Sequence, residues 1–380
     1  MDKIFQHLSE SNQLWQPCQS TAAKYVDVSE IWHGCDTLQA TSTRRKIMVE
    51  ELGKWLNGGE KKYVNDEIRS CVLRIVWIEY DPSIPQNNIS DTALRSIIDS
   101  FDLTLANGYF RTWFAGAATL PLKRLPTRTV RSYSFSYHPK LAFIWSRDTT
   151  ANRIQGICFA LPTQIAYLRE SLDTVRQLAD QEMIIAFLCS LLLTAEADRS
   201  QDMIKKEVRE IEVRTGYHQW SSRTEQAAPG DLARISAKIS GCATKTASTS
   251  RKIKVIQQLN EFILENLQQI PTCPVGVSPT AQQISSATDN VQLLQSYVQL
   301  LQTRAKMQQV DTDFFLHRID VQISAVCISS VSKTKRPNRI VANASERCLI
   351  SFTKTTPSPP SRLLEIQKPS PWQPSETRHQ

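Results

Sequence analysis

The sequence predicts a mixed α/β (α+β) domain at the N-terminus followed by long antiparallel stalk helices, with helix predominating overall. Residues 71–79 (CVLRIVWIE) are apolar and rich in β-branched side chains, which indicates a strand buried on both faces. From residue 231 onward the apolar residues recur only at helical spacing. Glycine makes up 11 of 380 residues, about 3% against a usual value near 7%, which disfavours a glycine-punctuated sandwich, a propeller or a glycine-rich nucleotide fold.

The first elements are expected around the buried strand. Residues 25–32 alternate weakly between apolar and polar side chains and predict a strand. Residues 44–57 place their apolar side chains at helical spacing, and Gly58-Gly59 would end that helix. The strand at 71–79 should end at Asp81-Pro82.

The middle of the chain alternates between helices and strands. Ser90 is a good N-cap for a helix whose apolar residues follow at i, i+3, i+4 and i+7, and Pro162 fits the first turn of another. Between these helices we expect three strands. They cover residues 132–137, 141–145 and 154–161.

The second half is predicted to be helical throughout. A helix over residues 181–215 should stop at Gly216, and Asp231 is a plausible N-cap for the next. Pro and Gly at 271–279 break the pattern before a last helix at about 280–327, on the order of 70 Å long. A helix of this length needs a partner helix or a second subunit to bury its apolar stripe. The stripe residues are Leu294, Val298, Leu301, Phe315, Ile319 and Ile323.

The charge distribution divides the chain further. The formal net charge is +8, yet residues 328–380 alone hold nine Lys/Arg, three Asp/Glu and seven of the 18 prolines. We therefore expect a disordered basic tail over 328–380, after a mixed α/β domain over 1–225 and a helical stalk over 226–327. The body carries a net of +2, so no nucleic-acid partner is expected. The run at 333–339 (KTKRPNR) is interpreted as a basic stretch of that tail, with a nuclear address or a membrane-surface patch as alternatives.

Cysteine usage and hydropathy favour the cytoplasm. The nine cysteines are widely spaced without a CxxC, and Cys71, Cys158 and Cys189 lie in apolar runs typical of reduced core thiols. The N-terminus lacks the apolar stretch of a signal peptide. The longest apolar run, residues 183–194, is too short for a spanning helix of about 20 residues and predicts a buried core helix.

Motifs for several kinds of chemistry are absent. The sequence has no phosphate loop, no GxGxxG, no Gly-x-Ser-x-Gly elbow and no HExxH. His33 and Cys35 with Cys18 form the one nearby cluster of zinc-ligand types, and a structural role is favoured for them. We expect no catalytic residues and no required cofactor, and therefore no enzyme.

Carboxylates on the helix at 181–215 interleave with basic residues. Glu207, Glu210 and Glu212 alternate with Lys205, Lys206, Arg209 and Arg214. The pattern is typical of a solvated face with weak i, i+4 ion pairs. The alternative is a surface that contacts a neighbouring subunit.

Three stretches in the same order resemble the cytosolic part of fungal CorA-like divalent-cation transporters. They are residues 73–114 (LRIVWIEYDPS to YFRTWF), 134–145 (SFSYHPKLAFIW) and 190–220 (SLLLTAEADRS to GYHQW), and the last long helix is similar to the family's stalk. The resemblance covers about residues 65–327. It implies a pentameric funnel below a pore of two membrane helices per subunit, and a Gly-Met-Asn signature after the first span. This sequence has no Gly-Met-Asn and no span after the stalk, so we expect a truncated or divergent member without the pore, or a tail from a wrongly predicted reading frame.

The resemblance implies a role in magnesium or other divalent-cation transport, with a homo-oligomer on the cytosolic face of a membrane. Regulatory Mg²⁺ would bind carboxylate oxygens at subunit boundaries. The candidate ligands on the stalk helices are Glu261, Glu265, Asp311, Asp313 and Asp320, for which a solvated face is the competing interpretation. The alternative function is a soluble helical interaction or scaffold protein without transport activity.

Overall fold

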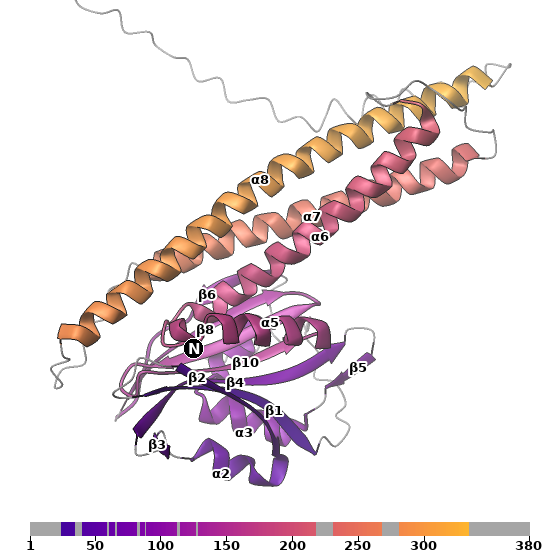
Figure 1. Cartoon of the computed structure of the whole chain (residues 1–380). Coiled ribbons are helices and arrows are strands. Elements are labelled where there is room, and N and C mark those ends of the chain that lie inside the picture. The colour runs from indigo at the N-terminus through magenta and orange to yellow at the C-terminus, as the bar shows by residue number, and fades with distance from the viewer. Residues whose placement is uncertain are drawn as a thin grey trace, which may run out of the picture.

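The computed structural model describes residues 24–34, 40–58, 61–64, 67–81, 84–87, 89–111, 115–126, 128–217, 231–267 and 281–333. A mixed β-sheet domain comes first and three long helices follow it, which confirms the predicted fold class (Figure 1). The longer strands are β1 Tyr25–Gly34, β2 Ala40–Met48, β4 Glu67–Asp81, β6 Ala115–Thr119, β8 Thr129–Tyr137, β9 Leu141–Asp148 and β10 Arg153–Ala160. Short strands are β3 Lys61–Val64, β5 Ile84–Asn87 and β7 Lys123–Arg124.

The sheet runs in the order β2-β1-β4-β10-β9-β8-β6, with β3 and β5 paired to β4 and β7 paired to β8. Along that path every pair is antiparallel except β4 with β10, which is parallel. The strands predicted at 25–32, 71–79, 132–137, 141–145 and 154–161 correspond to β1, β4, β8, β9 and β10. The central position of β4 explains why its sequence is apolar on both faces.

The helix predicted over residues 44–57 is wrong in its first part. Residues 44–48 belong to β2, which pairs with β1 in a continuous antiparallel register from Tyr25 opposite Met48 to His33 opposite Ala40. Only a 3₁₀ turn, Val49–Glu51, and helix α2, Leu52–Leu56, are helical there. The sheet edge offers residues 44–48 a full ladder of backbone hydrogen bonds, which outweighs their local helical spacing.

Local signals set the ends of the shorter helices. Helix α3, Asp91–Ser100, begins after Ser90, whose side chain accepts a hydrogen bond from the backbone N–H of Ala93 at 3.3 Å. Helix α5, Pro162–Thr174, begins at the predicted proline. Helix α4, Thr104–Phe110, was not anticipated from the sequence.

The sheet separates two apolar cores. On one face, Val76 and Ile78 of β4 pack in a cluster with residues of α2, α3 and α4. On the other face, Ile75 and Trp77 belong to a cluster that includes α5 and the long helices. Figure 1 shows the same division, with α2 and α3 below the sheet and α5 and the long helices above it.

The long helices form a bundle that extends past the sheet. They are α6 Ile184–Thr215, α7 Asp231–Leu267 and α8 Ala281–Lys333. Gly216, with φ of 71°, ends α6 at the predicted stop, because this left-handed conformation is unfavourable for residues with a Cβ. Helix α8 continues to Lys333, so the prediction of a disordered tail from residue 328 is wrong for residues 328–333, which extend the helix. The predicted domain boundary at 225/226, the proline segment 271–279 and residues 334–380 of the tail lie outside the described residues.

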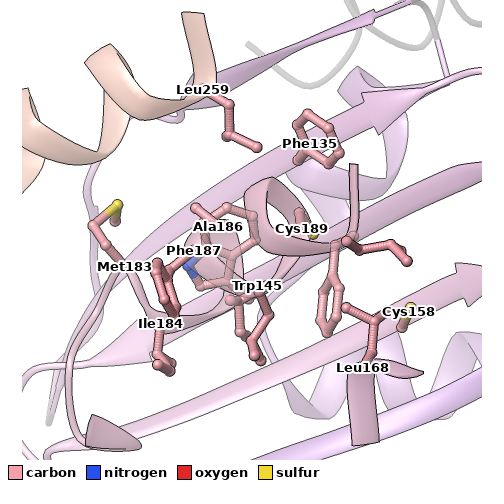
Figure 2. Packing of buried hydrophobic residues seen from close by; sticks show 14 of the residues in the cluster. Phe135, Trp145, Cys158, Leu168, Met183, Ile184, Ala186, Phe187, Cys189 and Leu259 are labelled. Carbon is pink, nitrogen blue, oxygen red and sulfur yellow. The ribbon is translucent and has the colours of Figure 1, made fainter. Parts of the chain in front are cut away.

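The first turns of α6 anchor the bundle in the sheet domain. Met183 and Ile184 through Leu188 are all buried, which confirms the buried core helix predicted from residues 183–194. Figure 2 shows this segment packed among Trp145 of β9, Phe135 of β8 and Leu168 of α5, with Leu259 of α7 approaching from the other side. Sheet and bundle therefore share one continuous apolar core.

The predicted core thiols are also confirmed. Cys71, Cys158 and Cys189 are free and buried. Burial raises the pKa of Cys71 to about 11 and raises the pKa of the other two as well. These cysteines therefore remain uncharged at neutral pH and serve as small core side chains.

A partly buried ion pair joins three helices beside this core. Lys252 of α7 donates to Glu196 of α6 at 2.8 Å, and Gln164 of α5 donates to the same carboxylate at 2.7 Å. Burial opposes ionisation of Glu196, but the Lys252 charge and the two hydrogen bonds outweigh it and lower the pKa of the carboxyl below its usual range. The interaction therefore stabilises the fold at neutral pH and weakens as the pH falls through the lowered pKa.

Replacing Lys252 with methionine should destabilise the protein by about 3 kcal/mol at pH 7, because Glu196 keeps its charge but loses its partner. Without Lys252, burial raises the pKa of the Glu196 carboxyl, so it becomes protonated as the pH falls and the difference from wild type should shrink. Urea unfolding of wild type and variant at pH 7 and pH 4 gives the difference in the free energy of unfolding at each pH. The control is Lys254→Met, which removes an exposed lysine from the same helix. Equal losses for the two variants at both pH values would contradict this role for the pair.

Candidate functional site on the helical bundle

The bundle contains two apolar cores separated by a polar layer. Near the sheet, residues 184–197 of α6 pack with residues 253–263 of α7 and 294–305 of α8. At the far end a second cluster joins residues 204–211, 235–242 and 315–326 of the same helices. Between the clusters lie the buried side chains of Gln201, Thr246, Thr249, Gln308 and Thr312.

Hydrogen bonds in this layer fix α6 against α8. Gln201 donates to the backbone oxygen of Gln308 at 2.6 Å and to the hydroxyl of Thr312 at 2.9 Å. Gln308 donates in return to the backbone oxygen of Thr194 at 3.1 Å and to Asp198 at 2.7 Å. A slip of either helix by one turn would leave these buried groups without partners, so the layer specifies the register of the bundle.

The carboxylates of α6 connect the helices of the bundle to one another. Glu212 accepts two hydrogen bonds, of 2.6 and 2.8 Å, from Arg318 of α8. Glu207 accepts a hydrogen bond of 2.6 Å from Lys245 of α7. Only Glu210 with Arg214 forms an i, i+4 pair among the described acids of this stretch. The hydrogen bond from Lys245 lowers the pKa of Glu207. The sequence-based interpretation as a face of local ion pairs is therefore incomplete, because the partners lie on other helices.

Helix α8 carries a second apolar stripe that its own bundle does not bury. Its residues recur every seven positions and are between 42% and 67% exposed: Leu300, Met307, Phe314, Val321 and Ile328. Val310, also exposed, adds to the stripe between Met307 and Phe314. Helices pair in a coiled coil through apolar residues at heptad positions a and d; here position a is apolar in five successive heptads, and Val310 is an apolar residue at position d. We call this set the outer stripe; the spacing was visible in the sequence but was not recognised there.

Charged residues flank the outer stripe on both sides. Taking the stripe as heptad position a, Lys306 and Asp313 occupy position g, whereas Asp311 and Arg318 occupy position e. In a parallel pair of such helices, a g residue faces the e residue five positions later on the partner. Lys306 would then face Asp311, a pair of opposite charge, whereas Arg318 already binds Glu212 of its own chain and leaves Asp313 free.

The five candidate metal ligands fall in two separate places. Glu261 and Glu265 lie one turn apart on the exposed side of α7, next to the sheet-proximal core. Asp311, Asp313 and Asp320 are exposed on the far half of α8, beside the outer stripe, and Asp313 accepts a hydrogen bond from Gln309 at 2.8 Å. Within one chain the structure does not bring the two groups together.

Within the described part of the chain, no group of three or more His, Cys, Asp or Glu side chains is arranged to hold a metal ion. The candidate cluster of Cys18, His33 and Cys35 cannot be assembled there, because both cysteines lie outside the described residues. Among the same described residues, no helix is both long enough and apolar enough to cross a lipid bilayer.

Comparisons with known proteins give distant likenesses among solved structures only. No protein-family model matches the sequence, and no curated protein matches it either. Among solved structures, the full-length CmaX protein aligns with 93% of this chain and 92% of its own, at 11% sequence identity and a TM-score of 0.42. A TM-score at this level is too low to carry a functional argument.

Proposed function

We propose that the chain is the cytosolic, ion-responsive assembly portion of a CorA-like divalent-cation transporter and has no enzymatic activity. The observation that carries this proposal is the outer stripe of α8, a row of exposed apolar side chains about 40 Å long at 1.5 Å per residue. The family resemblance in the sequence supplies the transporter class. The order of a mixed sheet domain followed by long stalk helices agrees with that class.

The outer stripe fits a second copy of the same chain. Two α8 helices in parallel would bury their stripes against each other and place Lys306 next to Asp311 of the other copy. The same association would bring Asp313 and Asp320 from neighbouring copies close to one axis. Closely spaced carboxylates repel one another unless a cation lies between them, and Mg²⁺ prefers such oxygen ligands. Assembly and cation binding would therefore depend on each other.

Oligomeric mass tests the assembly. We expect light scattering of the full chain to give the mass of a homo-oligomer, which the family resemblance implies is a pentamer. Phe314→Glu should give the mass of a monomer, because five carboxylates cannot be buried together on one axis. Leu122→Glu, at an exposed apolar residue of the sheet domain, is the matched control and should leave the mass unchanged. A wild-type chain that stays monomeric in the presence of Mg²⁺ would contradict the proposal.

A charge exchange tests the parallel register. Lys306→Glu and Asp311→Lys should each weaken the oligomer, since each places like charges opposite one another. The double variant restores opposite charges and should recover most of the lost association. A double variant as weak as the sum of the single variants would exclude this register.

A soluble helical scaffold remains the second candidate, because the same stripe could bind helices of another protein. The effect of Mg²⁺ on the stability of the oligomer distinguishes the transporter function from the scaffold function. If the oligomer is part of a cation-responsive assembly, Mg²⁺ should increase its stability, and neutralising Asp313 and Asp320 to asparagine should abolish that response. An oligomer whose stability does not change with Mg²⁺, and which does not co-fractionate with membranes, would favour the scaffold function.

A further inference from the structure

A pocket in the sheet domain, far from the bundle, has features of a ligand site. It lies where β1, β2 and β4 meet α2 and has a volume of about 380 Å³. That volume falls in the range of small-molecule sites, roughly 300–1,000 Å³. The pocket is independent of the outer stripe, so it concerns a function separate from assembly.

The walls of the pocket are basic around an apolar floor. Four of its nine lining residues are Lys or Arg, and Glu51 is the one acid among them. Ile47, Trp32 and Trp55 supply the apolar surface. Lys46 lies opposite Asp27 on the α5 face of the sheet, so its ammonium group points away from the pocket. Arg45, Lys54 and Arg74 against Glu51 give the lining a formal charge of +2, which favours an anion with an apolar part.

Arg74 at the pocket has more hydrogen-bond donors than partners. Its side chain is 2% exposed, and its guanidinium lies 5.4 Å from the centre of the Trp55 ring. Nε lies 3.3 Å from Glu30 and Nη2 donates to the backbone oxygen of Gly58 at 3.4 Å, while Nη1 has no hydrogen-bond partner. A buried guanidinium normally uses its five donors.

Glu30, the counter-charge of Arg74, also accepts hydrogen bonds from two other groups. Its Oε2 accepts from Arg45 at 2.9 Å and its Oε1 accepts from the Trp55 indole at 2.9 Å. It therefore shares only part of its charge with Arg74. Counting Glu30, the site keeps a net charge of +1.

The geometry points to a site for a small organic phosphate. A phosphate monoester carries about −1.5 to −2 charge at neutral pH and is attracted by the net positive charge of the site. Its oxygens suit the unused guanidinium donors of Arg74, since arginine binds phosphate through parallel hydrogen bonds. The apolar body of such a ligand would rest on Ile47 and the two tryptophans. Lys54, exposed at the rim, would add to the attraction of the phosphate.

Calorimetric titration of the full chain with adenosine monophosphate, inorganic phosphate and adenosine tests the site. We expect the monophosphate to bind most tightly, inorganic phosphate to bind more weakly, and adenosine not to bind. Affinity for the monophosphate should fall with added salt, since the attraction is electrostatic. Equal affinity for the monophosphate and adenosine, or no binding of any of the three probes, would overturn the proposal.

Two variants and one control localise the binding. Lys54→Glu should weaken binding of adenosine monophosphate by about tenfold, whereas Lys254→Glu, the same charge change at an exposed position of α7, should leave it within about twofold. Arg74→Lys keeps the charge but removes the planar fork, and should also weaken binding about tenfold. If circular dichroism shows that Arg74→Lys is not folded, the comparison of Lys54→Glu with Lys254→Glu is sufficient to test the site. Equal affinities in that pair would refute the site.

Discussion

Replacing Glu30 with leucine should lower the free energy of unfolding by about 3–5 kcal/mol, because the change leaves a buried guanidinium without its counter-charge. Glu30 of β1 is fully buried and lies directly across from Arg74 of β4 in the antiparallel ladder. The same substitution also leaves the Trp55 indole without its acceptor. Two buried donors thus lose their partner at once.

Urea unfolding of Glu30→Leu should be compared with that of Glu50→Leu, which removes an exposed carboxylate a short distance along the chain. The exposed change should stay within about 0.5 kcal/mol of wild type. A double variant, Glu30→Leu with Arg74→Met, should recover part of the loss, because it removes both charges from the interior. Equal stabilities of Glu30→Leu and Glu50→Leu would show that the buried pair does not stabilise the sheet.

Truncating Leu259 to alanine should cost about 2–5 kcal/mol, since the site lies in the closed junction between sheet and bundle. Leu259 is 1% exposed and belongs to the cluster shared by the sheet, α5 and all three long helices. Its side chain approaches Phe135 of β8 in Figure 2. The neighbouring side chains are held by two different structural layers, so they have little freedom to fill the cavity.

Unfolding of Leu259→Ala should be followed by both tryptophan fluorescence, to which Trp32, Trp77 and Trp145 of the sheet contribute, and far-ultraviolet circular dichroism, which reports on the helices. The two transitions should coincide and shift together, as expected for one cooperative unit with a shared core. Leu122→Ala, the same truncation at an exposed site, should have little effect. Separate transitions for the two probes would mean that the bundle and the sheet domain unfold independently.

Local chemistry explains which elements were predictable. The cap at Ser90, the helix start at Pro162 and the stop at Gly216 each depend on a residue and its immediate neighbours, and all three appear in the structure. The central strand β4 was also predictable, because burial on both faces leaves a continuous apolar run. Residues 44–48 were wrongly predicted to be helical, because the strand they form depends on pairing with β1.

The contacts around the two candidate sites required the tertiary structure. The partner of Glu212 is Arg318, and the partner of Glu207 is Lys245, each on a helix distant in sequence. Local spacing had suggested nearer partners, because the sequence does not reveal which helix packs beside which. The basic pocket likewise combines residues from β1, β2, α2 and β4, and no short motif contains them.

Helix α8 shows most clearly what the sequence determines and what only the tertiary structure determines. The sequence by itself determined that this helix is long and amphipathic and that its stripe from Leu294 to Ile323 needs a partner. The tertiary structure decided that α6 and α7 of the same chain are that partner, and that a second stripe from Leu300 to Ile328 stays exposed. The physical reason is that two helices packed on one side cover only part of the circumference of a third, while periodicity alone does not rank one apolar face above another.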